Sequence, residues 1–193
     1  MRKKILSYTL IGLFVVTAAG IVYAAFSDKG NVLGSSFSVA SADIKIMADT
    51  TQGTNPANLV DEIPGPSFEN IGQTWHEDYA LKLVNNGTTK LNVISNAYYE
   101  TINDPQDIRE SIYVEIFEWS DANNDGVADE GEYPNSYGIK KTIVKWKTEG
   151  IDLGEFNAGQ SKPLVIRFST ENLSDTKQGA TAIFDFIFEA IEM

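Results

Sequence analysis

The stretch TAIFDFIFEAIE, residues 181–192, carries the strictest alternation in the sequence. Side chains point to opposite faces of a β-strand with a period of two. One side of this stretch therefore carries three phenylalanines, and the other carries two acids and three isoleucines. These residues are Phe184, Phe186 and Phe188 on the first side, and Ile183, Asp185, Ile187, Glu189 and Ile191 on the second. The pattern predicts a strand that carries its phenylalanines on one face.

Similar alternation recurs along the chain and indicates the fold class. The predicted strands lie at 79–84, 91–93, 111–119, 142–147 and 164–168. Asn86-Gly87 is the strongest two-residue hairpin signal, and residues 103–110 are expected to form one short helix. With seven to nine strands separated by turns, the sequence predicts an all-β protein, an antiparallel β-sandwich of jelly-roll type.

The chain begins with a leader. Arg2, Lys3 and Lys4 precede an uncharged apolar run that extends from Ile5 to Ala25. We expect a signal peptide at 1–24, cleaved after Ala24. The run is also long enough to span a bilayer, so retention as an anchor remains an alternative.

Charge and composition restrict the partners. Without the leader the chain has 193 − 24 = 169 residues and a charge of 12 − 27 = −15. Such an acidic surface repels nucleic acid and anionic lipid, whereas divalent cations are natural counterions. The chain contains no cysteine, so core packing, a metal or partner chains must replace disulfides in an exported domain.

Residues 121–132, DANNDGVADEGE, fit the twelve-residue calcium loop D-x-[DN]-x-[DN]-G-x₅-E at every defined position. The predicted ligands are Asp121, Asn123, Asp125, the carbonyl of Val127, Asp129 and a bidentate Glu132. The segment before the loop is a predicted strand and YPNSYG follows it, unlike the helices of an EF-hand. A solvated hairpin loop is the alternative, since Asp, Asn and Gly also dominate turns. If Ca²⁺ binds, its role would be structural.

Catalytic patterns are scarce. The sequence has no G-x-S-x-G or H-E-x-x-H motif, and His76 is its single histidine, whereas a catalytic zinc normally takes two or three. No catalytic residue is therefore predicted, and we expect no enzyme activity. Trp75, Trp119 and Trp146 are compatible with a sugar site, but also with core and rim packing.

Two apolar pairs near the leader differ in parity. Phe37 and Val39 occupy odd positions, whereas Ile44 and Ile46 occupy even ones. A flat strand cannot bury both pairs on one face, so a bulge or bend is expected near 40–42. This feature separates an N-terminal arm, residues 25–39, from a domain of residues 40–193.

Several segments together resemble one family. YAAFSDKGNVLGSSFSVASADIKI (23–46), IPGPSFENIGQ (63–73), LVNNGTTKLNV (83–93), IDLGEFNAGQSKPLVIRF (151–168) and KQGATAIFDFIFEA (177–190) are similar to the TasA/camelysin family of secreted biofilm-matrix fibre subunits. Archaeal bundling-pilus subunits share this jelly-roll plan. The resemblance spans most of the chain after the leader.

The resemblance implies assembly. Such subunits polymerise head to tail by donor-strand complementation, in which the N-terminal strand of one subunit fills a groove in the next. Phe26, Phe37 and Val39 would then be donor-strand residues, and identical subunits would be the partners, in the extracellular matrix or at the cell surface. No stable membrane association is expected after leader cleavage. Camelysin-type members have been classed as metallopeptidases, but this sequence supplies no zinc site.

Two alternatives of other classes remain open. One is a monomeric calcium-stabilised adhesin or carbohydrate-binding sandwich, which would present an aromatic platform on an exposed face. The other is a secreted hydrolase, which would need clustered acids beside a pocket.

Overall fold

The computed structural model describes residues 42–69, 71–177 and 180–193, and the leader and the N-terminal arm lie outside these residues. The described residues form ten strands, one α-helix and four short 3₁₀ turns. The strands are β1 (Ile44–Met47), β2 (Leu59–Val60), β3 (Thr74–Asn85), β4 (Leu91–Tyr98), β5 (Ile112–Glu118), β6 (Asn135–Ser136), β7 (Lys141–Thr142), β8 (Ile151–Phe156), β9 (Ser161–Glu171) and β10 (Asp185–Glu192). The helix is α2 (Ile143–Glu149), and the 3₁₀ turns are η1 (Pro56–Asn58), η2 (Thr101–Asn103), η3 (Ile108–Glu110) and η4 (Asp175–Lys177).

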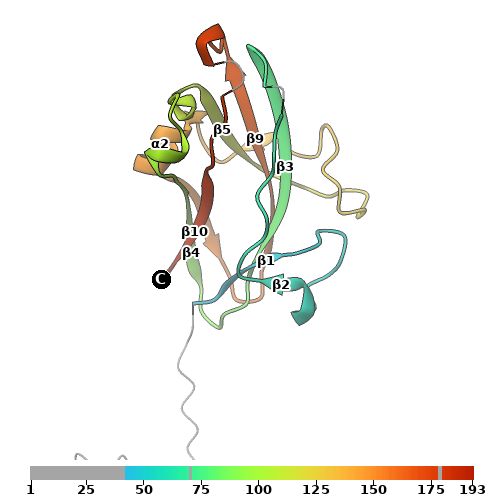
Figure 1. Cartoon of the computed structure of the whole chain (residues 1–193). Helices are drawn as coiled ribbons and strands as arrows, with labels where there is room; N and C mark the ends of the chain where they lie inside the picture. Colours follow the sequence, from blue (N-terminus) through green and yellow to red (C-terminus); the bar gives the residue numbers. More distant parts are fainter. Residues whose placement is uncertain (1–41, 70, 178–179) are drawn as a thin grey trace, which may run out of the picture. The chain divides into compact units, whose positions relative to one another are not determined.

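The strands form two antiparallel sheets. The larger sheet has the order β2-β1-β3-β9-β5-β6, with β7 also on β5, and the smaller has the order β10-β4-β8. In Figure 1, β3, β9 and β5 run side by side, and β10 and β4 lie in the second layer. An all-β, antiparallel two-sheet architecture with a short helix is thereby confirmed. The jelly-roll connection and the donor strand stay predictions.

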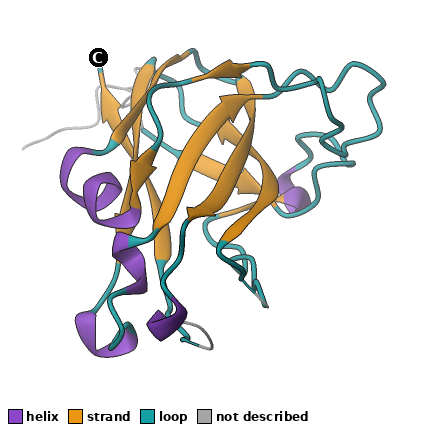
Figure 2. Cartoon of the chain, turned by 90° about the horizontal axis from the view of Figure 1, so that it is seen from above, coloured by secondary structure: helices purple, strands orange, loops and turns teal. Residues whose placement is uncertain are grey.

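The core fills the space between the sheets. Leu83 and Ile166 enter it from the larger sheet and are fully buried, and Val93 and Phe156 enter it from the smaller one. These residues occupy alternate positions of long strands, so the period-two pattern of the sequence corresponds to burial. Figure 2 shows the strands seen from above, with the helical segments at the periphery.

Residues 142–147 were predicted as a strand, and this prediction is wrong. They form β7 at Lys141–Thr142 and most of α2. Thr142 caps the helix by accepting a hydrogen bond from the Lys145 N–H. Ile143 and Trp146 are both fully buried, and a spacing of three residues places them on one helix face. The helix ends at Gly150, whose φ of +64° favours glycine.

The predicted Asn86-Gly87 hairpin is also wrong. β3 and β4 do not pair with each other, because β3 belongs to the larger sheet and β4 to the smaller one. The connection instead crosses between the layers. The buried side chain of Asn85 holds it there: its Nδ2 donates to the carbonyls of Thr89 (2.7 Å) and Phe156 (3.1 Å), and its Oδ1 accepts from the Gly87 N–H (3.0 Å).

Residues 103–110, expected to form one helix, do not do so. Residues 104–107 separate the two 3₁₀ turns η2 and η3. The buried Asp104 carboxylate accepts bonds from the backbone N–H groups of Ile108 (2.8 Å) and Arg109 (3.1 Å) and pairs with the Arg109 guanidinium (2.8 Å). Local side-chain bonds therefore replace a continuous helical ladder.

Candidate functional site

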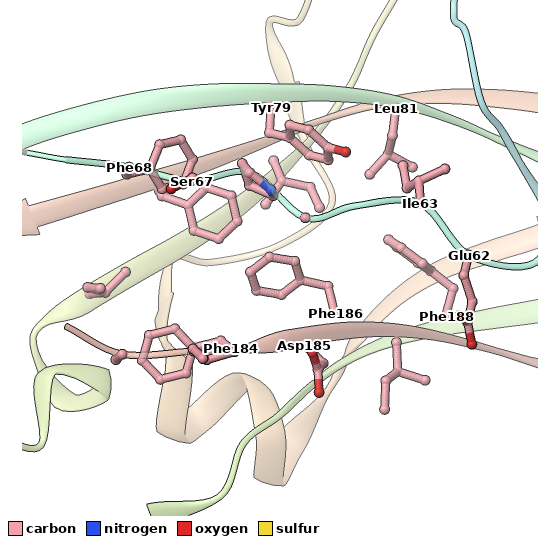
Figure 3. Close-up of a pocket in the computed structure, with 18 of the residues that line it drawn as sticks. Glu62, Ile63, Ser67, Phe68, Tyr79, Leu81, Phe184, Asp185, Phe186 and Phe188 are labelled. Carbon is pink, nitrogen blue, oxygen red and sulfur yellow. The ribbon is translucent and has the colours of Figure 1, made fainter. Parts of the chain in front are cut away.

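An apolar groove with a volume of about 1030 Å³ opens between the two sheets. Its walls come from β1, β3, β9, the connection between β2 and β3, residues 180–188, and the first residues of η3 and β5. Figure 3 shows Phe186 and Phe188 on one side of the groove, with Tyr79 and Leu81 on the other. This volume lies at the upper end of the usual range of small-molecule pockets, about 300–1,000 Å³.

The aromatic side of β10 forms one wall. Phe184, just before the strand, and Phe186 and Phe188 within it are half-buried and pack against the core. Phe186 stacks on Trp146 and contacts Phe168, with ring centroids 5.0 Å apart in both pairs. The side chains on the opposite side of β10 are exposed. The division of faces predicted from the sequence is therefore confirmed, but the aromatic face is only partly covered.

Residues 61–69, which we call the strap, form the facing wall. The strap contains no strand or helix, and within the described residues its backbone makes no main-chain hydrogen bond. Phe68 anchors it through ring contacts with Trp75 (5.1 Å) and Phe168 (5.2 Å). Tyr79 donates a hydrogen bond from its hydroxyl to the Pro64 carbonyl (3.1 Å), and burial raises the pKa of this tyrosine. A few side-chain contacts thus hold the strap.

The predicted calcium loop, 121–132, follows β5 and packs on residues 49–53. Gly126 has φ +76°, and a Cβ at this position would lie 2.5 Å from the Thr51 Cα. The Thr50 hydroxyl donates to the Gly126 carbonyl (2.7 Å). Glycine is therefore required here for close backbone approach as well as for the turn.

The loop's ligand positions already serve as hydrogen-bond acceptors. Asp121 Oδ2 accepts from Lys82 Nζ (3.0 Å) and from the Gly126 N–H (3.1 Å). The bond from Lys82 holds the pKa of Asp121 below its usual value. Asn123 Oδ1 and Asp125 Oδ1 each accept the N–H two residues ahead, at 3.0 and 2.8 Å. Alternate side chains thus turn inward on a tight loop.

Glu132 closes the loop onto β5. Its Oε1 accepts from the Ala122 N–H (3.0 Å), and its Oε2 accepts from Trp119 Nε1 (3.0 Å) and the Asp129 N–H (3.2 Å). The bond from Trp119 is the main cause that lowers the pKa of Glu132. The glutamate therefore joins both ends of the loop, as a bidentate twelfth ligand would.

We tested whether these residues fit a calcium ion. Asp121 Oδ1 is buried and has no hydrogen-bond partner, which leaves one acceptor of the loop unsatisfied. Against this, Asn123 Nδ2 donates to Asp125 Oδ2 (2.9 Å) and Asp129 Oδ2 (3.2 Å), so an amide holds these carboxylates together. Within the described residues no three acidic or histidine side chains converge on one point. The types of ligand and their order therefore fit calcium. Two N–H donors, from Lys82 and Asn123, already bond to oxygens that a calcium ion would also need.

The other sequence candidates take different places. Trp119 and Trp146 are 1% and 0% exposed, so they belong to the core, whereas Trp75 is half-buried in the groove. An exposed platform made of all three tryptophans is therefore excluded. His76 is exposed on β3. Phe26, Phe37 and Val39 lie outside the described residues.

Comparisons with known proteins give no match, either to a protein-family model or to a curated protein sequence. Among the residues that the structure describes, no helix is long and apolar enough to cross a membrane.

Proposed function

We propose that this protein is a structural subunit of an extracellular filament, a biofilm-matrix fibre or a pilus. Subunits polymerise head to tail by donor-strand complementation, and the arm of residues 25–39 is the donor. The observation that carries the proposal is the apolar groove. The phenylalanines of its wall are only half-buried, although the chain as a whole is strongly acidic. A concave site lined mainly by apolar and aromatic side chains is a common place for a ligand or a peptide segment to bind.

The chemistry of the groove favours a peptide over a reacting substrate. Its lining is dominated by aliphatic and aromatic side chains, and in Figure 3 the carboxylate of Asp185 points away from the phenylalanine rings. Strand addition obtains affinity from main-chain hydrogen bonds and specificity from alternate apolar side chains. The arm offers such side chains in Phe37 and Val39.

We further propose that the loop 121–132 binds Ca²⁺ in a structural role. The ligands would be Asp121, Asn123, Asp125, Val127 through its carbonyl, Asp129 and Glu132. Calcium would supply positive charge to a carboxylate-rich loop. The support is the complete motif and the unpartnered buried Asp121 oxygen.

The filament proposal is tested with the chain beginning at Ala25 and the chain beginning at Ala40. We expect the longer chain to sediment as filaments visible by negative-stain microscopy. The shorter chain should melt cooperatively, as a folded domain does, yet remain monomeric. Filaments of normal appearance from the shorter chain, or a longer chain that stays monomeric under all conditions, would refute the proposal.

A further inference from the structure

The groove has several walls, but its strands do not all offer a place for another strand. β1 lies between β2 and β3, β3 between β1 and β9, β9 between β3 and β5, and β5 between β9 and the short strands β6 and β7. Each of these strands is already paired on both sides. β10 pairs with β4 on one side, and among the described residues no strand pairs with its other side. β10 is therefore the groove strand with an open edge.

The strap cannot serve as an alternative partner for a strand. Pro64 and Pro66 lie two residues apart within it and therefore point the same way along an extended chain. Proline has no N–H, so these two positions cannot donate to an incoming backbone. The strap can pack against a guest peptide but cannot form a regular ladder with it.

From these relationships, and resting on the proposed function, we infer where and how the arm docks: residues 33–39 of a second copy join the open edge of β10. They become the fourth strand of the sheet β10-β4-β8. Leu33, Phe37 and Val39 point into the groove, beside the phenylalanine side of β10, and Gly34, Ser36 and Ser38 face away from it.

The pattern of the arm supports this register. In LGSSFSV, residues 33–39, the three apolar side chains and Ser35 share one parity, and the other parity holds only glycine and serine. Seven extended residues span about 24 Å, and the eight residues of β10 span about 27 Å. Phe26 has the opposite parity to Phe37 and precedes Gly30, so it lies outside this strand.

The absence of charge also favours residues 33–39 as the docked strand. Residues 30–42 carry no charged side chain, whereas the chain as a whole has a net charge of −12. An uncharged strand can enter the groove of an equally acidic neighbour without burying a charge. It also adds no repulsion beside Glu62 and Asp185, which line the groove.

The fold favours a second copy over the chain's own arm. Asp43 is bound to Asn86 through its carbonyl (2.8 Å) and its carboxylate (2.6 Å). β1 therefore starts beside the 86–90 connection, and β10 ends there too, since Met193 N–H bonds to the Lys90 carbonyl. To run along its own β10, the arm would need to reverse within residues 40–42. Only these three residues would be left for the reversal, because the arm ends at Val39 and Asp43 is already bound to Asn86.

Cysteine cross-linking tests the docking site, because the natural chain contains no cysteine. Ser36→Cys is combined in one chain with a second cysteine at an outward-facing β10 position, Asp185→Cys, Ile187→Cys or Glu189→Cys. Adjacent strands bring opposite Cα atoms to about 4.5–5.5 Å, within disulfide range. At least one pair should give a ladder of covalent multimers from oxidised filaments. The matched control, Ser36→Cys with Ser67→Cys in the strap, should give none.

The outcomes separate the docking site from the function. Filaments that cross-link to Ser67→Cys, or to none of the three β10 positions, would overturn the docking site but leave the filament proposal intact. Cross-links confined to single chains would overturn docking to a second copy. Failure of the cysteine-free chain to form filaments would refute the proposed function itself.

A parity test needs no cysteine. Phe37→Asp should abolish sedimentation as filaments, and Ser36→Asp, one residue away on the other side of the strand, should preserve it. The reverse result, or equal loss in both variants, would overturn the register. The melting temperatures of both variants as monomers should match that of the unmodified chain, because the proposed docking joins the arm to a neighbouring subunit and not to its own domain.

Discussion

Lys82 Nζ lies 3.0 Å from Asp121 Oδ2, and it also lies 4.6 Å from the centre of the Trp119 ring. The side chains of Lys82 and Asp121 are only 14% and 12% exposed, so solvent screens this pair incompletely. An ammonium group therefore neutralises the first ligand position of the predicted calcium loop. A calcium ion and Lys82 would compete for the same carboxylate.

Replacing Lys82 should expose this competition. We expect Lys82→Met to lower the melting temperature in chelator, because Asp121 loses its partner. The same variant should bind calcium more tightly than the unmodified chain, because a positive charge has left the site. Titration of the thermal shift with calcium measures both effects. The matched control is Lys140→Met, which removes a lysine bound to Glu171 instead. A Lys82→Met variant with weakened calcium binding would contradict the competition.

Calcium itself should stabilise the fold. A ligand that binds only the native state adds RT ln(1 + [L]/Kd), about 2.7 kcal/mol at a hundredfold excess over Kd. Glu132→Gln should remove most of the calcium-dependent rise in melting temperature, because it destroys the bidentate carboxylate. Glu130→Gln, in the same loop but at a non-ligand position, should keep it. Identical melting of the unmodified chain in calcium and in chelator would exclude the calcium site.

The ion pair between Asp78 and Arg167 predicts a loss of stability in acid. Arg167 donates to both carboxylate oxygens of Asp78 at 2.7 Å, and the Tyr133 hydroxyl adds a third bond at 2.9 Å. Burial alone would raise the pKa of Asp78, but these bonds lower it below its usual value. A lowered native pKa contributes stability above the ordinary value near 4, and this contribution is lost as the pH falls through the native pKa.

Asp78→Asn should therefore cost about 1.5–3 kcal/mol at neutral pH, the usual range for bonds to a charged group. Its melting temperature should also fall less steeply between about pH 5 and pH 2 than that of the unmodified chain. Glu115→Gln is the matched control, since Glu115 lies opposite Arg167 on the other neighbouring strand. If the melting temperatures of Asp78→Asn and of the unmodified chain change with pH in parallel, the ion pair does not contribute to the pH dependence of stability.

The fold could be predicted from the sequence where burial follows the local period, as in 184–188. It could not be predicted where tertiary contacts decide. Thr142 and Gly150 are ordinary helix-capping residues, but the β-branched Ile143-Val144 suggested a strand. Asn86-Gly87 favours a hairpin locally, yet the bonds of Asn85 to Thr89 and Phe156 direct β4 into the other sheet.

The candidate site shows the same division. The shared face of Phe184, Phe186 and Phe188 could be predicted from their alternation, but their place in the groove could not. The strap shows no hydrophobic periodicity in the sequence. Its prolines, glycine and acids are typical of any surface loop, so its place beside the groove could not be predicted. Its position depends on Phe68 meeting Trp75 and Phe168, the latter about a hundred residues further along the chain. Sequence spacing alone cannot reveal such a contact.

The proposed lack of enzyme activity has its own test. His76 is exposed on β3, and one histidine without cysteine supplies too few strong ligands for an open zinc site. We expect no chelator-sensitive cleavage of casein by the purified chain. Cleavage that disappears in His76→Ala, but persists in the neighbouring Glu77→Gln variant, would establish a peptidase instead.

The last prediction concerns the two phenylalanines of the arm, which the docking register treats differently. Phe37 enters the groove, and burying a phenylalanine side chain contributes about 1.5–3 kcal/mol. Each subunit junction of a filament would lose this contribution in Phe37→Ala, so the critical concentration for assembly should rise by about tenfold to a hundredfold. Phe26 precedes the docked strand, so Phe26→Ala should raise the critical concentration by less.

Sedimentation over a concentration series, with microscopy of the pellets, measures both values. A larger loss from Phe26→Ala than from Phe37→Ala would place the docked strand nearer the start of the arm. That result would exclude residues 33–39 as the strand beside β10 and retain donor-strand assembly. If neither substitution changes the critical concentration, the arm is not buried at the junction, because removing a buried aromatic ring cannot leave the association free energy unchanged.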